Sequence, residues 1–302
     1  MKTARLHILV AVASLTPVLH AQVDDFNDGN DTGWQRYNPI GTATFSVQNG
    51  AYRIQSAATP NPDFGPGRAG SIRNDAIYTT NFYVAVDVTN WNDSVNQSFG
   101  LLARITAPGA GTTMGYAFTY DRGTTATSGD MDISGISNEA PFAVSVTGSE
   151  AIHMVPGQTY RFVFLGIDST LEGRVYQHPD LLTPVARITG SDSTFTQGVC
   201  GLVVYANATA AAPDATFDNY FATNSEPIIP PPLTIEPEPP GVWVSWSTNA
   251  AGFVLQMTSD LSANPQTWAD LTDPFEENGR YRYFEFATTS RHLFFRLRRP
   301  PD

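Results

Sequence analysis

Two aspartates placed two residues apart are the first candidates for chemistry in this sequence. Asp130 and Asp132 stand in the segment Gly129-Asp130-Met131-Asp132-Ile133-Ser134, and alternate residues of a strand face the same side. Two carboxyl groups on one face are what glycoside hydrolysis normally requires. Ser134 is the next residue on that face, and a hydroxyl cannot act as a strong general acid. We therefore expect Asp130 and Asp132 to be solvated turn or edge residues.

The other residue types that carry catalysis do not occur in catalytic spacings. His153, His178 and His292 are far apart in the sequence and are expected to be ordinary surface or loop residues. Neither a Gly-x-Ser-x-Gly elbow nor a Gly-x-x-x-x-Gly-Lys loop occurs, which removes support for the nucleophilic hydrolases and nucleotide sites that need them. Cys200, the single cysteine, lies in an apolar run and is expected to be a buried, inert thiol. We assign no catalytic residue, and an enzyme is the less favoured interpretation.

Aromatic residues beside polar ones are the candidates for ligand binding. Trp91 lies in Asn90-Trp91-Asn92-Asp93, an arrangement compatible with a platform for a sugar ring. The alternative is a partly buried tryptophan at the rim of a sheet. Tyr120 and Asp121 form a weaker candidate, as does Asn207 in Tyr205-Ala206-Asn207.

Charge and the N-terminus limit the class of protein. The 302 residues carry 17 Lys and Arg against 29 Asp and Glu, a net charge of −12, which disfavours nucleic acid and anionic membranes as partners. Lys2 and Arg5 precede an apolar run that is too short to span a bilayer, and Ala21 offers a small-residue cleavage site. We expect residues 1–21 to be a signal peptide and the product to be secreted, without membrane insertion.

The hydrophobic pattern after the signal peptide has a period of two. Residues 44–47 and 51–54 alternate on either side of Asn49-Gly50, a strong hairpin signal. Further alternating or β-branched runs are separated by turn residues, and no helical stripe is sustained. Many short strands predict an all-β protein built as a two-sheet sandwich.

Proline marks the boundary between two domains. Prolines crowd residues 227–240 around the short run Leu233-Thr234-Ile235, and proline-rich chain favours extended, semi-rigid geometry. We therefore expect a large domain over residues 22–224, a linker over 225–232 and a small domain over 233–302.

The large domain resembles the concanavalin A-like, laminin G-like jelly rolls of bacterial secreted proteins. The resemblance is carried by the order of several short motifs: Asp24-Asp25-Phe26, Gly33-Trp34, Asn49-Gly50-Ala51-Tyr52, Gly100-Leu101-Leu102-Ala103-Arg104, Pro156-Gly157-Gln158-Thr159-Tyr160-Arg161 and Phe217-Asp218-Asn219-Tyr220. It implies two curved antiparallel sheets in which the first and last strands are neighbours. Laminarinase-type hydrolases on this fold carry a Glu-x-Asp-x-(x)-Glu strand, and here Ser134 stands where the second glutamate would be.

The C-terminal segment resembles a small fibronectin-III-like β-domain. The motifs are Val242-Trp243-Val244-Ser245-Trp246, Phe253-Val254-Leu255-Gln256, Thr267-Trp268-Ala269-Asp270-Leu271 and Phe294-Phe295-Arg296-Leu297-Arg298. Trp246 and Trp268 are expected to anchor its core.

The resemblance of the large domain also implies one structural calcium ion. Sugar-active relatives bind it with two backbone carbonyls and an aspartate on the last strand, which correspond here to Asp25, Gly50 and Asp218. Oxygen ligands suit calcium. The nearby loop Asp28-Gly29-Asn30-Asp31-Thr32-Gly33 has the composition of a calcium turn, but Pro39 at the twelfth position excludes an EF-hand. The alternatives are an Asx-rich surface turn for this loop and plain backbone hydrogen bonding for Asp218.

Together these observations predict a secreted, non-catalytic recognition module for extracellular polysaccharide or cell-surface glycan. The alternatives are a structural envelope or matrix protein and, less favoured, a glycoside hydrolase or polysaccharide lyase with an unrecognised site.

Overall fold

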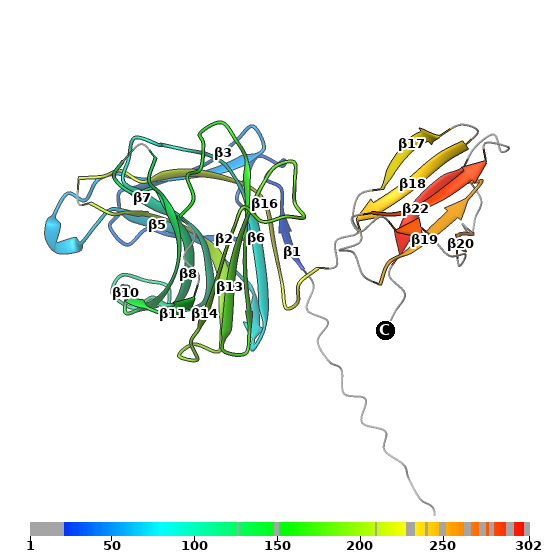
Figure 1. Ribbon diagram of the computed structural model, residues 1–302. Coiled ribbons are helices and arrows are strands. Elements are labelled where there is room, and N and C mark those ends of the chain that lie inside the picture. Colours follow the sequence, from blue (N-terminus) through cyan, green and yellow to red (C-terminus); the bar gives the residue numbers. More distant parts are fainter. Residues whose placement is uncertain are drawn as a thin grey trace, which may run out of the picture. The chain divides into compact units, whose positions relative to one another are not determined.

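The chain forms two compact units, residues Met1–Glu226 and Pro227–Asp302 (Figure 1). The computed structural model describes residues 21–125, 127–147, 151–208, 210–227, 233–238, 241–247, 252–262, 267–271, 276–277, 281–287 and 293–298. The expected signal peptide lies outside the described residues except for Ala21, as does most of the expected linker. No helix among the described residues is long and apolar enough to cross a membrane.

The first layer of the large unit is a nine-stranded sheet in which every pairing is antiparallel. Eight of its strands follow the order β11 (Ser145–Thr147), β14 (Ala186–Ser191), β13 (Thr170–Gln177), β12 (Tyr160–Ile167), β6 (Phe82–Trp91), β16 (Asp214–Thr223), β4 (Ala51–Ser56) and β3 (Ala43–Gln48). The ninth, β1 (Gln22–Asp24), pairs with β16. The first and last strands of the unit are therefore neighbours, as the resemblance implies.

The second layer is a seven-stranded antiparallel sheet. Its order is β10 (Ala140–Ala143), β9 (Asp130–Ser137), β8 (Met114–Asp121), β7 (Gln97–Thr106), β15 (Gln197–Ala206), β5 (Arg68–Thr79) and β2 (Trp34–Tyr37). One 3₁₀ turn, η1 (Pro62–Phe64), precedes β5. The expected all-β, two-sheet sandwich is confirmed.

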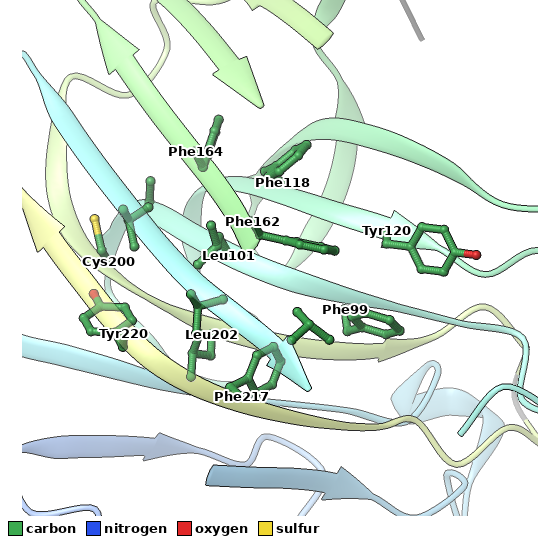
Figure 2. Packing of buried hydrophobic residues seen from close by; sticks show 14 of the residues in the cluster. Phe99, Leu101, Phe118, Tyr120, Phe162, Phe164, Cys200, Leu202, Phe217 and Tyr220 are labelled. Carbon is green, nitrogen blue, oxygen red and sulfur yellow. The ribbon is translucent and has the colours of Figure 1, made fainter. Parts of the chain in front are cut away.

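The core of the large unit lies between the two sheets. Alternate residues of β7 and β8 face inward, among them Phe99, Leu101, Phe118 and Tyr120, and Figure 2 shows them beside Phe162 and Phe164 of β12. The ring centroids of Phe118 and Phe162 are 5.8 Å apart. Because strand residues alternate in direction, the residues between these face away from the core. The sequence of each strand thus assigns an inner and an outer face.

The turn between β3 and β4 is the one expected from Asn49-Gly50. Both residues have positive φ, 53° and 72°, as a tight two-residue hairpin requires. A Cβ on Gly50 would lie 2.5 Å from Asn27 Oδ1, so glycine is also needed for close packing.

A buried arginine joins three loops at one end of the sandwich. Arg104 is 1% exposed and donates hydrogen bonds to the carbonyls of Phe195 (2.9 Å), Asp168 (2.8 Å) and Thr80. These carbonyls follow β14, β12 and β5, so one side chain satisfies the ends of three strands. Its guanidinium carbon also lies 5.2 Å from the centroid of the Phe82 ring.

The small unit has two sheets of its own. One has the order β17 (Thr234–Glu238), β18 (Gly241–Ser247), β22 (Tyr281–Ala287) and β21 (Glu276–Glu277), and the other β20 (Ala269–Asp270), β19 (Val254–Thr258) and β23 (Phe294–Arg298). Val244, Trp246 and Leu255 form its buried core. Trp246 is therefore a core anchor, as expected. Arg296 lies over the ring of Trp268, at 4.2 Å from the centroid.

Candidate functional site

A groove of about 450 Å³ lies on the outer face of the seven-stranded sheet. It is lined by residues of all seven strands, of the β7–β8 loop and of the ends of β9 and β15: Tyr37, Arg68, Ser98, Leu102, Thr113, Ala117, Thr119, Asp121, Asp130, Met131, Asp132, Ser134, Ile136, Glu139, Pro141, Val203, Tyr205 and Asn207. Apolar and polar side chains are mixed, as in sites that bind small organic molecules.

Strand register assembles one polar row across this groove. Asp130 of β9 pairs with Asp121 of β8, and Asp121 pairs with Ser98 of β7. Ser98 pairs with Tyr205 of β15, and Tyr205 with Arg68 of β5. Directly paired side chains on one face have Cβ atoms about 4.5–5.5 Å apart. Five polar side chains from five strands therefore follow one line.

A second row runs beside the first. Asp132 pairs with Thr119, and Thr119 with Gly100. A Cβ on Gly100 would lie 2.2 Å from the carbonyl oxygen of Phe118, so no larger residue fits there. Glycine therefore lets the backbones of β7 and β8 approach closely beside Thr119.

Thr119 offers a free hydroxyl on the floor of the groove. The residue is 9% exposed, and no other residue in the described part of the chain forms a hydrogen bond with its side chain. The hydroxyl oxygen is not one of the fully buried atoms that lack a partner, so it keeps some accessible surface, and Thr119 lines the groove. The ring of Tyr205 is half-buried nearby in the same lining.

The three aspartates give one wall of the groove a negative potential. Burial raises the pKa of Asp132, and the charges of Asp130 and Asp121 raise it further. Burial and Asp121 likewise raise the pKa of Asp130. None of the three forms an ion pair with a described arginine or histidine. Asp130 and Asp132 are exposed to solvent at the groove.

Asp121 and Asn207 form a hydrogen-bonded corner at the end of the polar row. Asn207 Nδ2 donates to Asp121 Oδ1 at 2.8 Å, and Ser98 Oγ donates to Asn207 Oδ1 at 3.1 Å. The backbone N–H of Gly123 donates to the same Asp121 oxygen at 2.8 Å. These bonds fix the orientation of the carboxylate and the amide.

Arg68, the arginine of the groove lining, is paired with the carboxylate of Glu139. Arg68 Nε donates to Glu139 Oε1 at 2.7 Å, the hydroxyl of Tyr37 donates to the same oxygen, and Gly111 N donates to Oε2 at 2.7 Å. Burial alone would raise the pKa of Glu139, but the bonds from Arg68 and Tyr37 outweigh it and lower that pKa.

The structure brings together two of the four ligand residues expected from the sequence. Asp121 and Asn207 line the groove, whereas Trp91 is 5% exposed and Tyr120 is fully buried. Trp91 packs on Phe99 and donates to Asp93 at 3.1 Å, and the hydroxyl of Tyr120 accepts from the backbone N–H of Met154 at 3.3 Å. Neither ring can stack on a ligand, so the expectation of a sugar platform at Trp91 and Tyr120 is corrected.

Asp130 and Asp132, expected to be solvated turn or edge residues, are exposed but belong to neither a turn nor an edge strand. Asp130 and Asp132 lie within β9, one strand in from the edge strand β10, and both line the groove. Thr119, Tyr205, Arg68 and Glu139 were not singled out as site residues.

The expected calcium ligands converge at one end of β16. Phe217 pairs with Tyr52 and Asp24 pairs with Tyr220, which brings Asp218 near the turn at Gly50 and the chain after β1. Burial raises the pKa of Asp218, and the negative charges of Asp87, Asp25 and Asp24 raise it further. The hydrogen bond from the backbone N–H of Asn219 lowers this pKa but does not cancel the rise. No three described His, Cys, Asp or Glu side chains are placed to hold a metal, so a cation here would depend on backbone and amide oxygens.

The loop that resembles a calcium turn is closed by its own side chains. Asn30 N donates to Asp28 Oδ1 at 3.1 Å, and Thr32 N donates to Asn30 Oδ1 at 2.8 Å. These are Asx turns.

The histidines and the cysteine have no catalytic arrangement among the described residues. His178 Nε2 lies 3.2 Å from Asp87 Oδ1, His153 Nδ1 lies 3.5 Å from the Ser128 carbonyl, and His292 lies outside the described residues. Cys200 is fully buried, and burial raises its pKa to about 12. A thiol with that pKa is protonated and unreactive at neutral pH.

Comparison with known proteins gives loose matches in structure. No family model and no curated protein matches the sequence. The lectin UEA-II, in complex with galactose, is 11% identical over 68% of this chain and 98% of its own, with a TM-score of 0.43. Peanut lectin is 9% identical over 69% and 99%, with a TM-score of 0.42. A Bacillus halodurans xylan β-1,4-xylosidase is 11% identical over 73% of this chain and 41% of its own, with a TM-score of 0.43. The sandwich assignment itself follows from the strand pairing of this chain.

Proposed function

We propose that the large unit is a secreted recognition module whose groove binds an extracellular saccharide without cleaving it. The observation that carries the proposal is the free hydroxyl of Thr119 between Asp132 and Gly100, on the floor of a groove that also contains Tyr205. Sugars present hydroxyls that need mixed donors and acceptors, and apolar ring faces that pack on aromatic side chains.

Binding is favoured over hydrolysis by the pKa values of the carboxyl groups. Acid–base catalysis by two carboxyl groups needs environments that push their pKa values apart. Here both pKa values are raised, that of Asp130 by burial and Asp121 and that of Asp132 by burial, Asp130 and Asp121. Ser134 supplies no third carboxyl group.

A glycan array probed with the exported chain tests the proposal, with Thr119→Val and Tyr205→Ala as variants. We expect each variant to lose about tenfold or more in affinity, the equivalent of about 1.4 kcal/mol. Thr44→Val is the matched control, since Thr44 is an exposed β3 residue on the other sheet. Unchanged binding by both groove variants would remove the groove as the site. No glycan bound at all would favour a structural envelope protein, and release of reducing sugar would favour a hydrolase.

Two further parts of the proposal concern export and relationship. The charged and then apolar N-terminus supports cleavage near Ala21, which N-terminal sequencing of the exported protein would test. The order of motifs in the sequence supports a laminin G-like origin for the large unit and a fibronectin-III-like origin for the small one.

We also propose a calcium ion held by the carbonyls of Asp25 and Gly50 and the carboxylate of Asp218. The negative surroundings of Asp218 support it, as does the closeness of Asn27 Oδ1 to Gly50. The ion would join both ends of the unit and stabilise it.

A further inference from the structure

Three carboxylates line one wall of the groove without a cation to balance them. Asp121 and Asp130 are direct partners across β8 and β9, and Asp132 is the next outward residue of β9. In the described part of the chain, none of them is within ion-pair distance of an arginine or histidine. The wall therefore carries formal negative charge that faces whatever occupies the groove.

The positive charge opposite does not neutralise this wall. Arg68 is bound by Glu139, whose second oxygen accepts from Gly111. The groove lining thus contains four carboxylates and one guanidinium, and one of the four is already paired. A ligand anion would meet no free cation among these residues.

A second and independent observation points to a ligand at the same place. Thr119 is more than nine-tenths buried and pairs directly with Asp132, yet its hydroxyl has no hydrogen-bond partner among the described residues and opens into the groove. A hydroxyl can accept as well as donate, so a donor group placed between Thr119 and Asp132 would satisfy both.

We propose that the groove selects saccharides bearing a protonated primary amine, of the glucosamine type, and rejects uronic acid polymers. This inference rests on the proposed function of the groove. An ammonium group placed against Asp132, Asp130 and the Thr119 hydroxyl has three donors for three acceptors, and its charge offsets the wall. A uronate carboxylate in that place would add a fourth unpaired negative charge.

Isothermal titration of the full exported chain with three hexasaccharides at about pH 6 and low salt tests the inference. The probes are glucosamine hexamer, its N-acetylated counterpart and galacturonic acid hexamer. At this pH the amine is protonated. We expect the glucosamine hexamer to bind about tenfold tighter than the N-acetylated one, and the uronate not to bind. The preference should shrink in high salt, because exposed charges are screened.

Variants then separate the charge of the wall from the binding function. Asp132→Asn and Asp130→Asn should each reduce the preference for the amine over the N-acetylated hexamer about tenfold, which corresponds to about 1.4 kcal/mol. Asp168→Asn is the matched control, because Asp168 is exposed in the β12–β13 turn and its φ of 52° suits asparagine.

The outcomes distinguish this inference from the proposed function. Three results would overturn the amine preference and leave saccharide binding in place: equal affinity for the amine and the N-acetylated hexamer, tighter binding of the uronate, or binding only of other neutral glycans on the array. Absence of any saccharide binding would overturn both.

Discussion

Replacing Arg104 with methionine should destabilise the large unit strongly. Arg104 is 1% exposed and serves three carbonyls, those of Phe195, Asp168 and Thr80. Methionine keeps most of the apolar length of the side chain but removes all of these donors. The variant therefore isolates the hydrogen bonds from the loss of packing.

The expected loss follows from the number of carbonyls left without a donor. Each buried polar group that loses its partner costs about 1–3 kcal/mol. Only the bond to the Phe195 carbonyl is fully buried, whereas those to Asp168 and Thr80 are part-buried. Three such groups therefore set an upper range, which is reduced further because the variant no longer buries a charge. Burial already lowers the pKa of Arg104, which is a sign of that cost. We expect a net loss of about 3–5 kcal/mol in the free energy of unfolding.

Differential scanning calorimetry of the full chain measures this loss. For a unit of this size, 1 kcal/mol moves the Tm by about 2–4 °C, so the transition of the large unit should fall by about 10 °C. Arg36→Met is the control, since the Arg36 side chain is 52% exposed and pairs with Asp31 at 2.7 Å. Such exposed pairs contribute about 0–1 kcal/mol. If the two variants shift the Tm equally, the three carbonyls find other partners and the reasoning fails.

Three more predictions concern titration, metal and thiol chemistry. The raised pKa of Asp132 means that the folded state binds its proton more tightly than the unfolded state does, so this carboxyl group costs stability as the pH rises through the raised pKa. Asp132→Asn should therefore raise the Tm at neutral pH. Urea titrations should show that this gain in stability vanishes below about pH 3.8. A Tm difference that is constant with pH would contradict this cause. Millimolar calcium should raise the Tm of the large unit relative to EDTA, and Asp218→Ala should abolish the difference; identical curves for the unaltered protein would exclude the ion. Cys200 should resist a thiol reagent at about pH 8 in the folded protein and react fully in denaturant, because it is completely buried; rapid reaction of the folded protein would mean that the two sheets open.

The fold could be predicted from local pattern, because its signals are local. Asn49-Gly50 specifies a tight turn through the φ values of two residues, and alternation specifies strands one at a time. That β1 and β16 are neighbours could be predicted only from the order of the motifs, because pairing between distant strands has no signal in the local sequence.

The site could be predicted only in part, because it depends on register. Tyr120 and Asp121 are adjacent in one strand, so only one of them can face the groove, and the shared face of Tyr116, Phe118 and Tyr120 indicates that it is Asp121. Trp91 has polar neighbours in sequence, but it ends β6 beside a register shift in β16 and its ring enters the core. The row from Asp130 to Arg68 spans five strands from distant parts of the chain, and no spacing in the sequence reveals it.

The pairing of β1 with β16 makes the large unit a candidate for circular permutation. Gln22 lies opposite Ala222 in that ladder, so a short flexible bridge could join the two ends without distorting either sheet. New ends could then be opened at Gly111 or near Ser128, in loops at the ends of β7 and β8. The same closeness means that the unit could be inserted into a surface loop of another protein, entering and leaving at a single point, with the groove on the other sheet.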